Sequence, residues 1–131
     1  MRAKLTLAGV ALMLAAIPMA AHHSFAAEYD AAATVTLKGV VTKVEWANPH
    51  VYIYIDVKDE TGKVVNWFTE GYPPNMLTRT GFTRDIVKDG DTITITGYRA
   101  RNNASRAAAR ELTTSEGAKY NFGPAAPLPV F

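Results

Sequence analysis

The chain has 131 residues, with 14 basic and 12 acidic side chains, three histidines and no cysteine. This length is typical of a single domain. The absence of cysteine excludes disulfide bonds, thiol catalysis and thiolate metal sites, so the domain depends on its hydrophobic core for stability.

Residues 1–21 have the pattern of a secretory signal peptide. Two basic residues near the start precede an uncharged run from Leu5 to Ala21, which is too short and too rich in small residues for a membrane span. An uncleaved N-terminal anchor is the alternative. We expect cleavage after Ala21, so that the mature chain begins at His22, and cleavage after Ala20 is the second choice.

Removal of this leader leaves 110 residues with 12 basic and 12 acidic side chains, and therefore no formal net charge. Without a basic excess, the composition gives no support to a nucleic-acid partner. We expect a periplasmic or secreted protein of bacterial type, with no stable transmembrane segment after cleavage. Another envelope protein is the candidate partner.

The chain after the leader divides into an N-terminal segment of residues 22–33, a β domain of residues 34–123 and a proline-rich tail of residues 124–131. The first strand is predicted over residues 34–46, where apolar and polar residues alternate. The phase of the alternation changes near Gly39, which predicts a β-bulge or a sharp bend at that point.

The remaining elements follow from the same alternation and from turn residues. The clearest strand is "VYIYIDVKD", whose valines and isoleucines share one face while Tyr52 and Tyr54 share the other. Further strands are predicted at 63–71, 92–98, 109–115 and 118–122, with a short helix at 73–81. A short helix between the third and fourth strands predicts an all-β, OB-like five-stranded barrel. A small β-sandwich is the alternative.

The three histidines suggest a metal site. His50 lies between the first two strands, at one rim of the predicted barrel, and a flexible N-terminal segment could fold back onto it. At the mature N-terminus, His22 offers its α-amine and ring Nδ1 to one ion, and His23 and His50 could add imidazoles. This nitrogen-rich set favours Cu(II), Ni(II) or a similar divalent transition metal over Mg²⁺ or Ca²⁺.

Two variants of this hypothesis and one alternative stay open. If cleavage follows Ala20, His23 becomes the third residue, and the amine, two deprotonated amides and its imidazole would bind Cu(II). Glu28 and Asp30 are weaker candidate ligands. Alternatively, the two N-terminal histidines are only a soluble start to the chain, and His50 caps a turn with its ring against an aromatic neighbour.

A second hypothesis is a metal-free module that docks another envelope protein or a ligand. The candidate surface combines an aromatic face with an arginine-rich loop, although core packing and a solvated loop are the simpler interpretations. No nucleophile–base arrangement is evident, so we expect a binding protein rather than an enzyme. The residues of this candidate surface are Trp46, Tyr52, Tyr54, Trp67, Tyr72, Arg99, Arg101, Arg106 and Arg110.

Three stretches carry a family resemblance: "AHHSFAAEYD", "KGVVTKVEWANPHVYIYIDV" and "NWFTEGYPPNMLTRTGF". With them, the chain resembles a family of small exported bacterial proteins of uncharacterised function. The resemblance implies a signal peptide, a histidine-doublet start, a "W-x-NPH" segment and an OB-like β domain, but no ligand or activity. The positions that match this pattern are His22, His23, Trp46, Asn48, Pro49 and His50.

Overall fold

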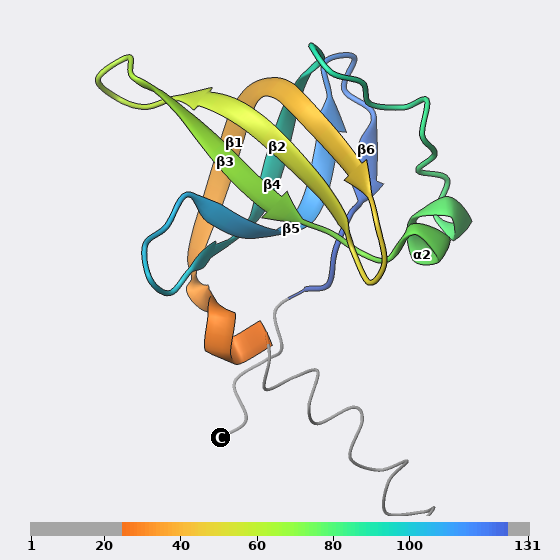
Figure 1. The fold of residues 1–131 in the computed structure, drawn as a ribbon, viewed down its shortest axis with the longest axis horizontal. Helices are drawn as coiled ribbons and strands as arrows, with labels where there is room; N and C mark the ends of the chain where they lie inside the picture. Colours follow the sequence, from red (N-terminus) through yellow and green to blue (C-terminus); the bar gives the residue numbers. More distant parts are fainter. Residues whose placement is uncertain (1–24, 126–131) are drawn as a thin grey trace, which may run out of the picture.

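The computed structural model describes residues 25–125. The predicted signal peptide, its cleavage sites, His22, His23 and residues 126–131 of the tail lie outside the described residues. A helical turn over residues 25–28 leads into the first strand (Figure 1). The elements are β1 (Tyr29–Trp46), β2 (Val51–Lys58), β3 (Val64–Glu70), α2 (Pro74–Arg79), β4 (Thr92–Ala100), β5 (Arg106–Thr114) and β6 (Lys119–Asn121).

The strands form one six-stranded sheet, mostly antiparallel, in which five strands close a ring. β1 pairs with both β2 and β4, β2 pairs with β3, and β4 pairs with β5. A short parallel pairing of β3 with β5, from Phe68 with Arg106 to Glu70 with Ala108, completes the ring. The predicted helix between the third and fourth strands and the predicted ring of five strands are confirmed. The last predicted strand, at residues 118–122, forms β6, which pairs with β5 outside the ring.

The long strand β1 pairs with two neighbouring strands along its length. Its middle pairs with β4 and its last part pairs with β2, and Val40 belongs to both pairings. A Cβ on Gly39 would lie 2.3 Å from the carbonyl oxygen of Asp56, so only glycine allows β2 to approach this closely. The predicted phase change near Gly39 is misplaced, because the extra residue lies farther along, between Val41 and Lys43. The strand also begins at Tyr29, earlier than residue 34.

The interior of the ring holds the main hydrophobic core. Alternate residues of β2 and β4 point inward, including Ile53, Ile55 and Ile95, as the sequence predicts. The segment after α2 contributes Phe82, whose ring stacks on Trp46 at 5.9 Å and meets Phe122 edge-on at 5.2 Å. Trp46 is therefore a packing residue of this core. Within residues 25–125, no helix is both long enough and apolar enough to span a membrane.

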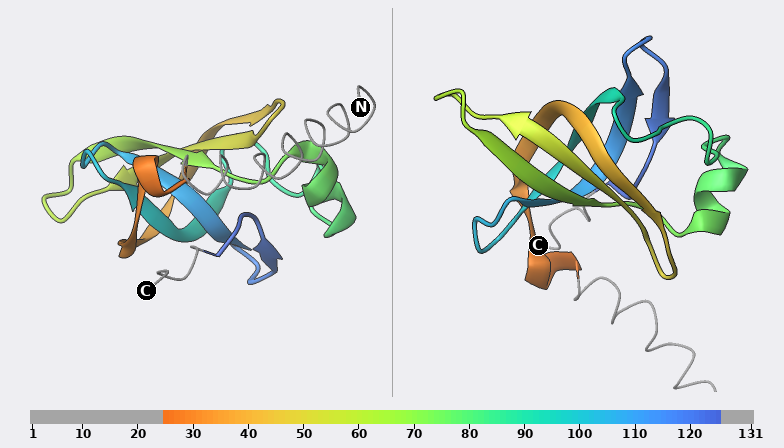
Figure 2. Two further views of the ribbon diagram at one scale, coloured as in Figure 1. Left: turned by 90° about the horizontal axis from the view of Figure 1, so that it is seen from below. Right: turned by 45° about the horizontal axis from the view of Figure 1, so that its top comes forward.

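A second, smaller cluster holds the N-terminal turn against the outside of the ring. Tyr29, Tyr98 and Ala108 are buried there, and Phe25 packs on the two tyrosine rings at centroid distances of 5.5 and 5.9 Å. This turn lies well apart from α2 (Figure 2). The cluster places residues 25–28 beside the seam where β3 and β5 meet.

Candidate functional site

Five polar side chains converge at the seam between β3 and β5, and we call them the seam cluster. Each comes from a strand end or the residue beside one, so side chains distant in the sequence meet at one edge of the ring. They are joined to one another by hydrogen bonds and ion contacts. The members are Glu28, Tyr29, His50, Glu70 and Arg106.

The orientation of His50 is fixed through its Nδ1 atom, which lies 2.8 Å from the carbonyl oxygen of Gly71. A carbonyl oxygen only accepts hydrogen bonds, so Nδ1 carries a hydrogen and donates it. The Gly71 carbonyl is itself held in place, because the amide of Tyr72, in the same peptide group, donates to the carbonyl oxygen of Phe122. A Cβ on Gly71 would lie 2.2 Å from the ring of Phe122, so this position requires glycine.

The other ring nitrogen of His50 faces a carboxylate. His50 Nε2 lies 3.2 Å from Glu70 Oε1. With Nδ1 protonated, a neutral ring directs the lone pair of Nε2 towards this negatively charged oxygen. The contact becomes favourable when Nε2 also carries a proton, or when a cation lies between the two atoms.

The second oxygen of Glu70 is held by Tyr29 and Arg106. The Tyr29 hydroxyl donates to Glu70 Oε2 over 2.6 Å, and Arg106 Nη2 donates to the same oxygen over 3.3 Å. Burial of the phenol, together with its hydrogen bond to the Glu70 carboxylate, raises the pKa of Tyr29 above its ordinary value. Glu70 is thus a half-buried carboxylate with one oxygen fixed and the other directed at His50.

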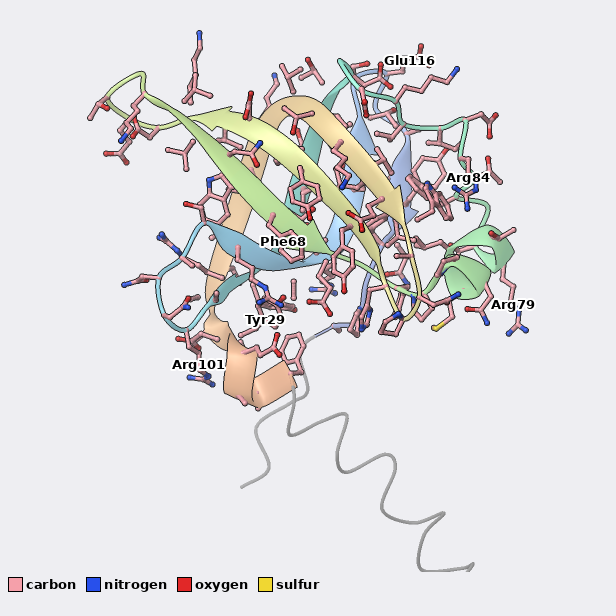
Figure 3. The ribbon with its side chains drawn as sticks, in the orientation of Figure 1. Tyr29, Phe68, Arg79, Arg84, Arg101 and Glu116 are labelled. Atoms are coloured by element: carbon pink, nitrogen blue, oxygen red, sulfur yellow. The ribbon has the colours of Figure 1, made fainter. Side chains whose placement is uncertain are left out.

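Arg106 completes the seam cluster by bridging two carboxylates. Its Nη2 lies 3.0 Å from Glu28 Oε2, its Nε donates to the Tyr29 hydroxyl, and its guanidinium lies over the rings of Tyr29 and Phe68. Figure 3 shows Tyr29 and Phe68 on the same side of the ring of strands. Burial alone would lower the pKa of Arg106. Its hydrogen bonds to Tyr29 and Glu70 and the charge of Glu28 have the larger combined effect, so the pKa of Arg106 is raised above its ordinary value. The side chain is therefore a permanent positive charge.

The seam cluster borders a cavity of about 470 Å³. Aromatic and apolar groups supply much of its wall, and the polar groups converge at one side. A cavity of this kind, with a few polar groups fixed in orientation, is a common form of ligand site. It is lined by the whole seam cluster together with Phe25, Tyr52, Gly71, Ala108 and Pro124.

The structure brings some of the predicted metal ligands together. His50 and Glu28 both belong to the seam cluster, whereas Asp30 is outside it and accepts a bond from the amide of Ala32. The ring of His50 lies 6.2 Å from that of Tyr52. Among residues 25–125, no three histidine, aspartate or glutamate side chains form a complete metal site.

The predicted aromatic face is divided between the two sides of the sheet. Tyr52 and Tyr54 lie on the outer side, where both contact the ring of Phe68 at 4.9 and 5.1 Å. Trp67 and Tyr72 instead pack against the core. Because successive residues of a strand point to opposite faces, Phe68 takes the outer position that the prediction gave to Trp67.

The predicted arginine-rich surface is also divided. Arg99 lies over the ring of Trp67 at 5.2 Å and donates to the carbonyl of Asn103. Arg101 binds the N-terminal turn, since its Nε donates to the carbonyl of Ala26 over 2.5 Å (Figure 3). Arg106 belongs to the seam cluster and Arg110 is exposed on β5. These arginines therefore do not form one anion-binding surface.

Sequence reasoning missed Glu70 and Tyr29. Glu70 could have been found by counting the β2–β3 hairpin outward from its turn, which pairs Glu70 with Tyr52 beside His50. Tyr29 carries no comparable signal, because it lies 41 positions before Glu70 in the chain.

Comparison with known proteins gives one match. Residues 10–109 match the sequence model of DUF6152, described as a family of unknown function. No curated protein and no solved structure matches the chain.

Proposed function

Because the chain belongs to DUF6152, a family of unknown function, we propose its function from its own residues. We propose that it is an exported protein that binds a divalent transition-metal ion, Cu(II) or a similar ion. The ligands are His50, Glu70 and the mature N-terminus with His22 and His23. The signal-peptide pattern supports export.

The pair formed by His50 Nε2 and Glu70 Oε1 carries this proposal. Two ligand atoms bound to one ion at 2.0–2.2 Å, with angles between square and tetrahedral, lie about 2.8–3.6 Å apart. The observed separation of 3.2 Å falls within this range. Metal-bound histidines commonly donate their other ring hydrogen to a backbone carbonyl, as His50 does to Gly71. The proposed site thus offers two ligand atoms, His50 Nε2 and Glu70 Oε1. The ring of His50 also makes the backbone hydrogen bond that is common for metal-bound histidines.

The charge of the seam cluster favours a cation. Glu28 and Glu70 are negative and Arg106 is positive, so the cluster has a net charge of −1 when His50 is uncharged. Imidazole and carboxylate are ligands of Cu(II), Ni(II) and Zn(II), and added nitrogen ligands shift the preference towards Cu(II) and Ni(II).

The position of Phe25 supports a contribution from the N-terminus. Phe25 lines the cavity beside His50, and its ring is held against Tyr29 and Tyr98. His23 precedes Phe25 by two residues. Since consecutive Cα atoms are about 3.8 Å apart, the Cα of His23 is within about 8 Å of that of Phe25. This short separation in the sequence supports a contribution of His23 to the site.

We also propose that the ring of strands is an OB-like barrel. The order in which β1, β2, β3, β5 and β4 pair, with α2 between the third and fourth strands, supports this assignment. The seam cluster then lies at one end of the barrel, on the side of β2 and β3.

The proposal is tested with the mature protein, cleaved in its host and purified without tag or chelator. Native mass spectrometry should give a chain beginning at His22 or Ala21 with one bound ion, or one that takes up a single added Cu(II). His50→Ala should weaken binding at least about tenfold, and so should a glycine added before His22. Asp30→Asn, which changes a carboxylate outside the seam cluster, is the control and should bind normally. A correctly cleaved chain that takes up no Cu(II) would contradict the proposal.

The second candidate function is docking of another envelope protein through the outer face of β2 and β3. The contact of Tyr52 and Tyr54 with Phe68 on this face favours it, as does Lys43, whose ammonium lies 5.4 Å from the Tyr54 ring centre. Under this reading, Tyr54→Ala or Lys43→Ala abolishes binding of the partner, while a residue added before the N-terminus has no effect.

A further inference from the structure

Arg106 has an unusual place for a residue of a cation-binding site. Its guanidinium bonds to the carboxylate that we assign as a metal ligand, at 3.3 Å from Glu70 Oε2, and to Glu28 at 3.0 Å. The rings of Tyr29 and Phe68 flank it at 5.5 and 5.1 Å. The protein therefore holds a positive charge of its own beside the ion.

We infer that Arg106 competes with the bound metal ion for Glu70 and keeps the site exchangeable, so that the protein passes its ion on instead of storing it. This inference rests on the proposed metal-binding function. It concerns how firmly the site holds the ion, which the choice of ligands alone does not determine.

The charge of the seam cluster before and after binding supports this role. With Arg106, the cluster changes from −1 to +1 when a divalent ion binds, counted with His50 uncharged. Without Arg106 the same groups would change from −2 to zero. The cost of holding net charge in a partly buried site rises with the square of that charge. Arg106 thus makes the empty and loaded states similar in this cost, whereas its removal would favour the loaded state.

The distances indicate how large the effect is. The ion and Arg106 would contact opposite oxygens of one carboxylate, and the Arg106 Nη2–Glu70 Oε2 distance is 3.3 Å. With a metal–oxygen bond of about 2.1 Å, the ion and the guanidinium nitrogen are separated by at most about 8 Å. With an effective dielectric constant of about 40–80 for a half-exposed site, Coulomb repulsion between charges of +2 and +1 at about 6–8 Å weakens binding by about tenfold to a hundredfold.

Arg106 also has a reason to be present when no ion is bound. Glu28 and Glu70 lie on either side of it, and both carboxylates contact the same Nη2 atom. Removing the guanidinium would leave two neighbouring carboxylates to repel each other. The same side chain therefore stabilises the empty site and weakens the loaded one.

The experiment compares Cu(II) affinity, by competition with a chelator of known affinity, and the rate of ion transfer to that chelator. Arg106→Gln should bind Cu(II) about tenfold to a hundredfold more tightly and release it correspondingly more slowly. Arg106→Lys keeps the charge and should stay near the wild type. Arg110→Gln removes an exposed arginine of the same strand outside the seam cluster, and should change affinity by less than about threefold.

A double variant distinguishes the effect of the charge of Arg106 on affinity from an effect of Arg106 on the structure of the site. Arg106→Gln combined with Glu28→Gln restores the net charge of the wild-type cluster, so its affinity should return to within a few fold of the wild type. If Arg106→Gln remains folded by circular dichroism but binds Cu(II) equally well or less well than the wild type, Arg106 positions Glu70 and the inference is wrong.

If Arg106→Gln does not fold, wild-type affinity in Arg106→Lys and in the double variant still supports the inference, and a tenfold departure in either overturns it. If the wild type binds no ion, the proposed function fails and this inference fails with it.

Discussion

Replacement of Glu70 by glutamine should separate its two roles, because the side chain keeps its shape and loses its charge. In the metal-free protein, Glu70 accepts hydrogen bonds from the Tyr29 hydroxyl and from Arg106 Nη2. A hydrogen bond to a charged group contributes about 1.5–3 kcal/mol, and the partial exposure of Arg106 places its share at the low end. We therefore expect Glu70→Gln to lower the free energy of unfolding by about 2 kcal/mol, or the melting temperature by roughly 10 °C.

The same substitution should have a larger effect on metal binding. It removes the carboxylate ligand that lies 3.2 Å from His50 Nε2, so the dissociation constant for Cu(II) should rise at least about tenfold. Chelator competition measures affinity, and urea denaturation with EDTA measures the stability of the metal-free state. The control is Glu111→Gln, whose partner Lys119 is 3.6 Å away on an exposed surface, and which should change neither quantity appreciably. A folded Glu70→Gln protein with wild-type affinity would refute the assignment of Glu70 as a ligand.

Three further predictions concern other residues. Burial and the Glu70 carboxylate raise the pKa of Tyr29 in the folded state, so its stabilisation is complete below about pH 10 and is lost as the pH rises further. In EDTA, Tyr29→Phe should therefore lose less stability than the wild type above pH 10, and identical pH profiles would contradict this. Gly39→Ala should lower the free energy of unfolding by about 2 kcal/mol or more in urea denaturation, because its Cβ would lie 2.3 Å from the Asp56 carbonyl oxygen. Phe25→Ala should weaken Cu(II) binding at least about threefold with little loss of global stability, because it loosens the N-terminal turn, and unchanged affinity would argue against an N-terminal ligand.

The strands could be predicted where alternation is strict. In β2, the buried positions Val51, Ile53 and Ile55 alternate with half-buried tyrosines, and this local pattern is sufficient to define the strand and its faces. The bulge in β1 was misplaced because Gly39 marks a close approach between strands, which produces the same glycine signal as a bulge.

The seam cluster could be predicted only in part. His50 stands out because histidines are rare in this chain. Its partner Glu70 depends on the hairpin register, and Arg106 comes 36 positions after Glu70, on a strand whose pairing with β3 has no local sequence signal. Pairing between strands so far apart in the chain is decided by the packing of the whole ring and cannot be deduced from any one segment.

The parallel seam between β3 and β5 has a consequence for the order of events during folding. Neighbouring antiparallel strands can form as local hairpins, but the pairing of Glu70 with Ala108 must close a long loop, which is an entropically costly and slow step. Because Glu70 and Arg106 lie on opposite sides of this seam, they meet only when the ring has closed. A chain stalled with only its hairpins formed would lack the complete seam cluster. Under the proposed function, a chain with only its β2–β3 hairpin formed could already hold His50 and Glu70 together, whereas Arg106 joins them only after the ring has closed. The exchangeable form of the proposed site is thus restricted to molecules that have finished folding.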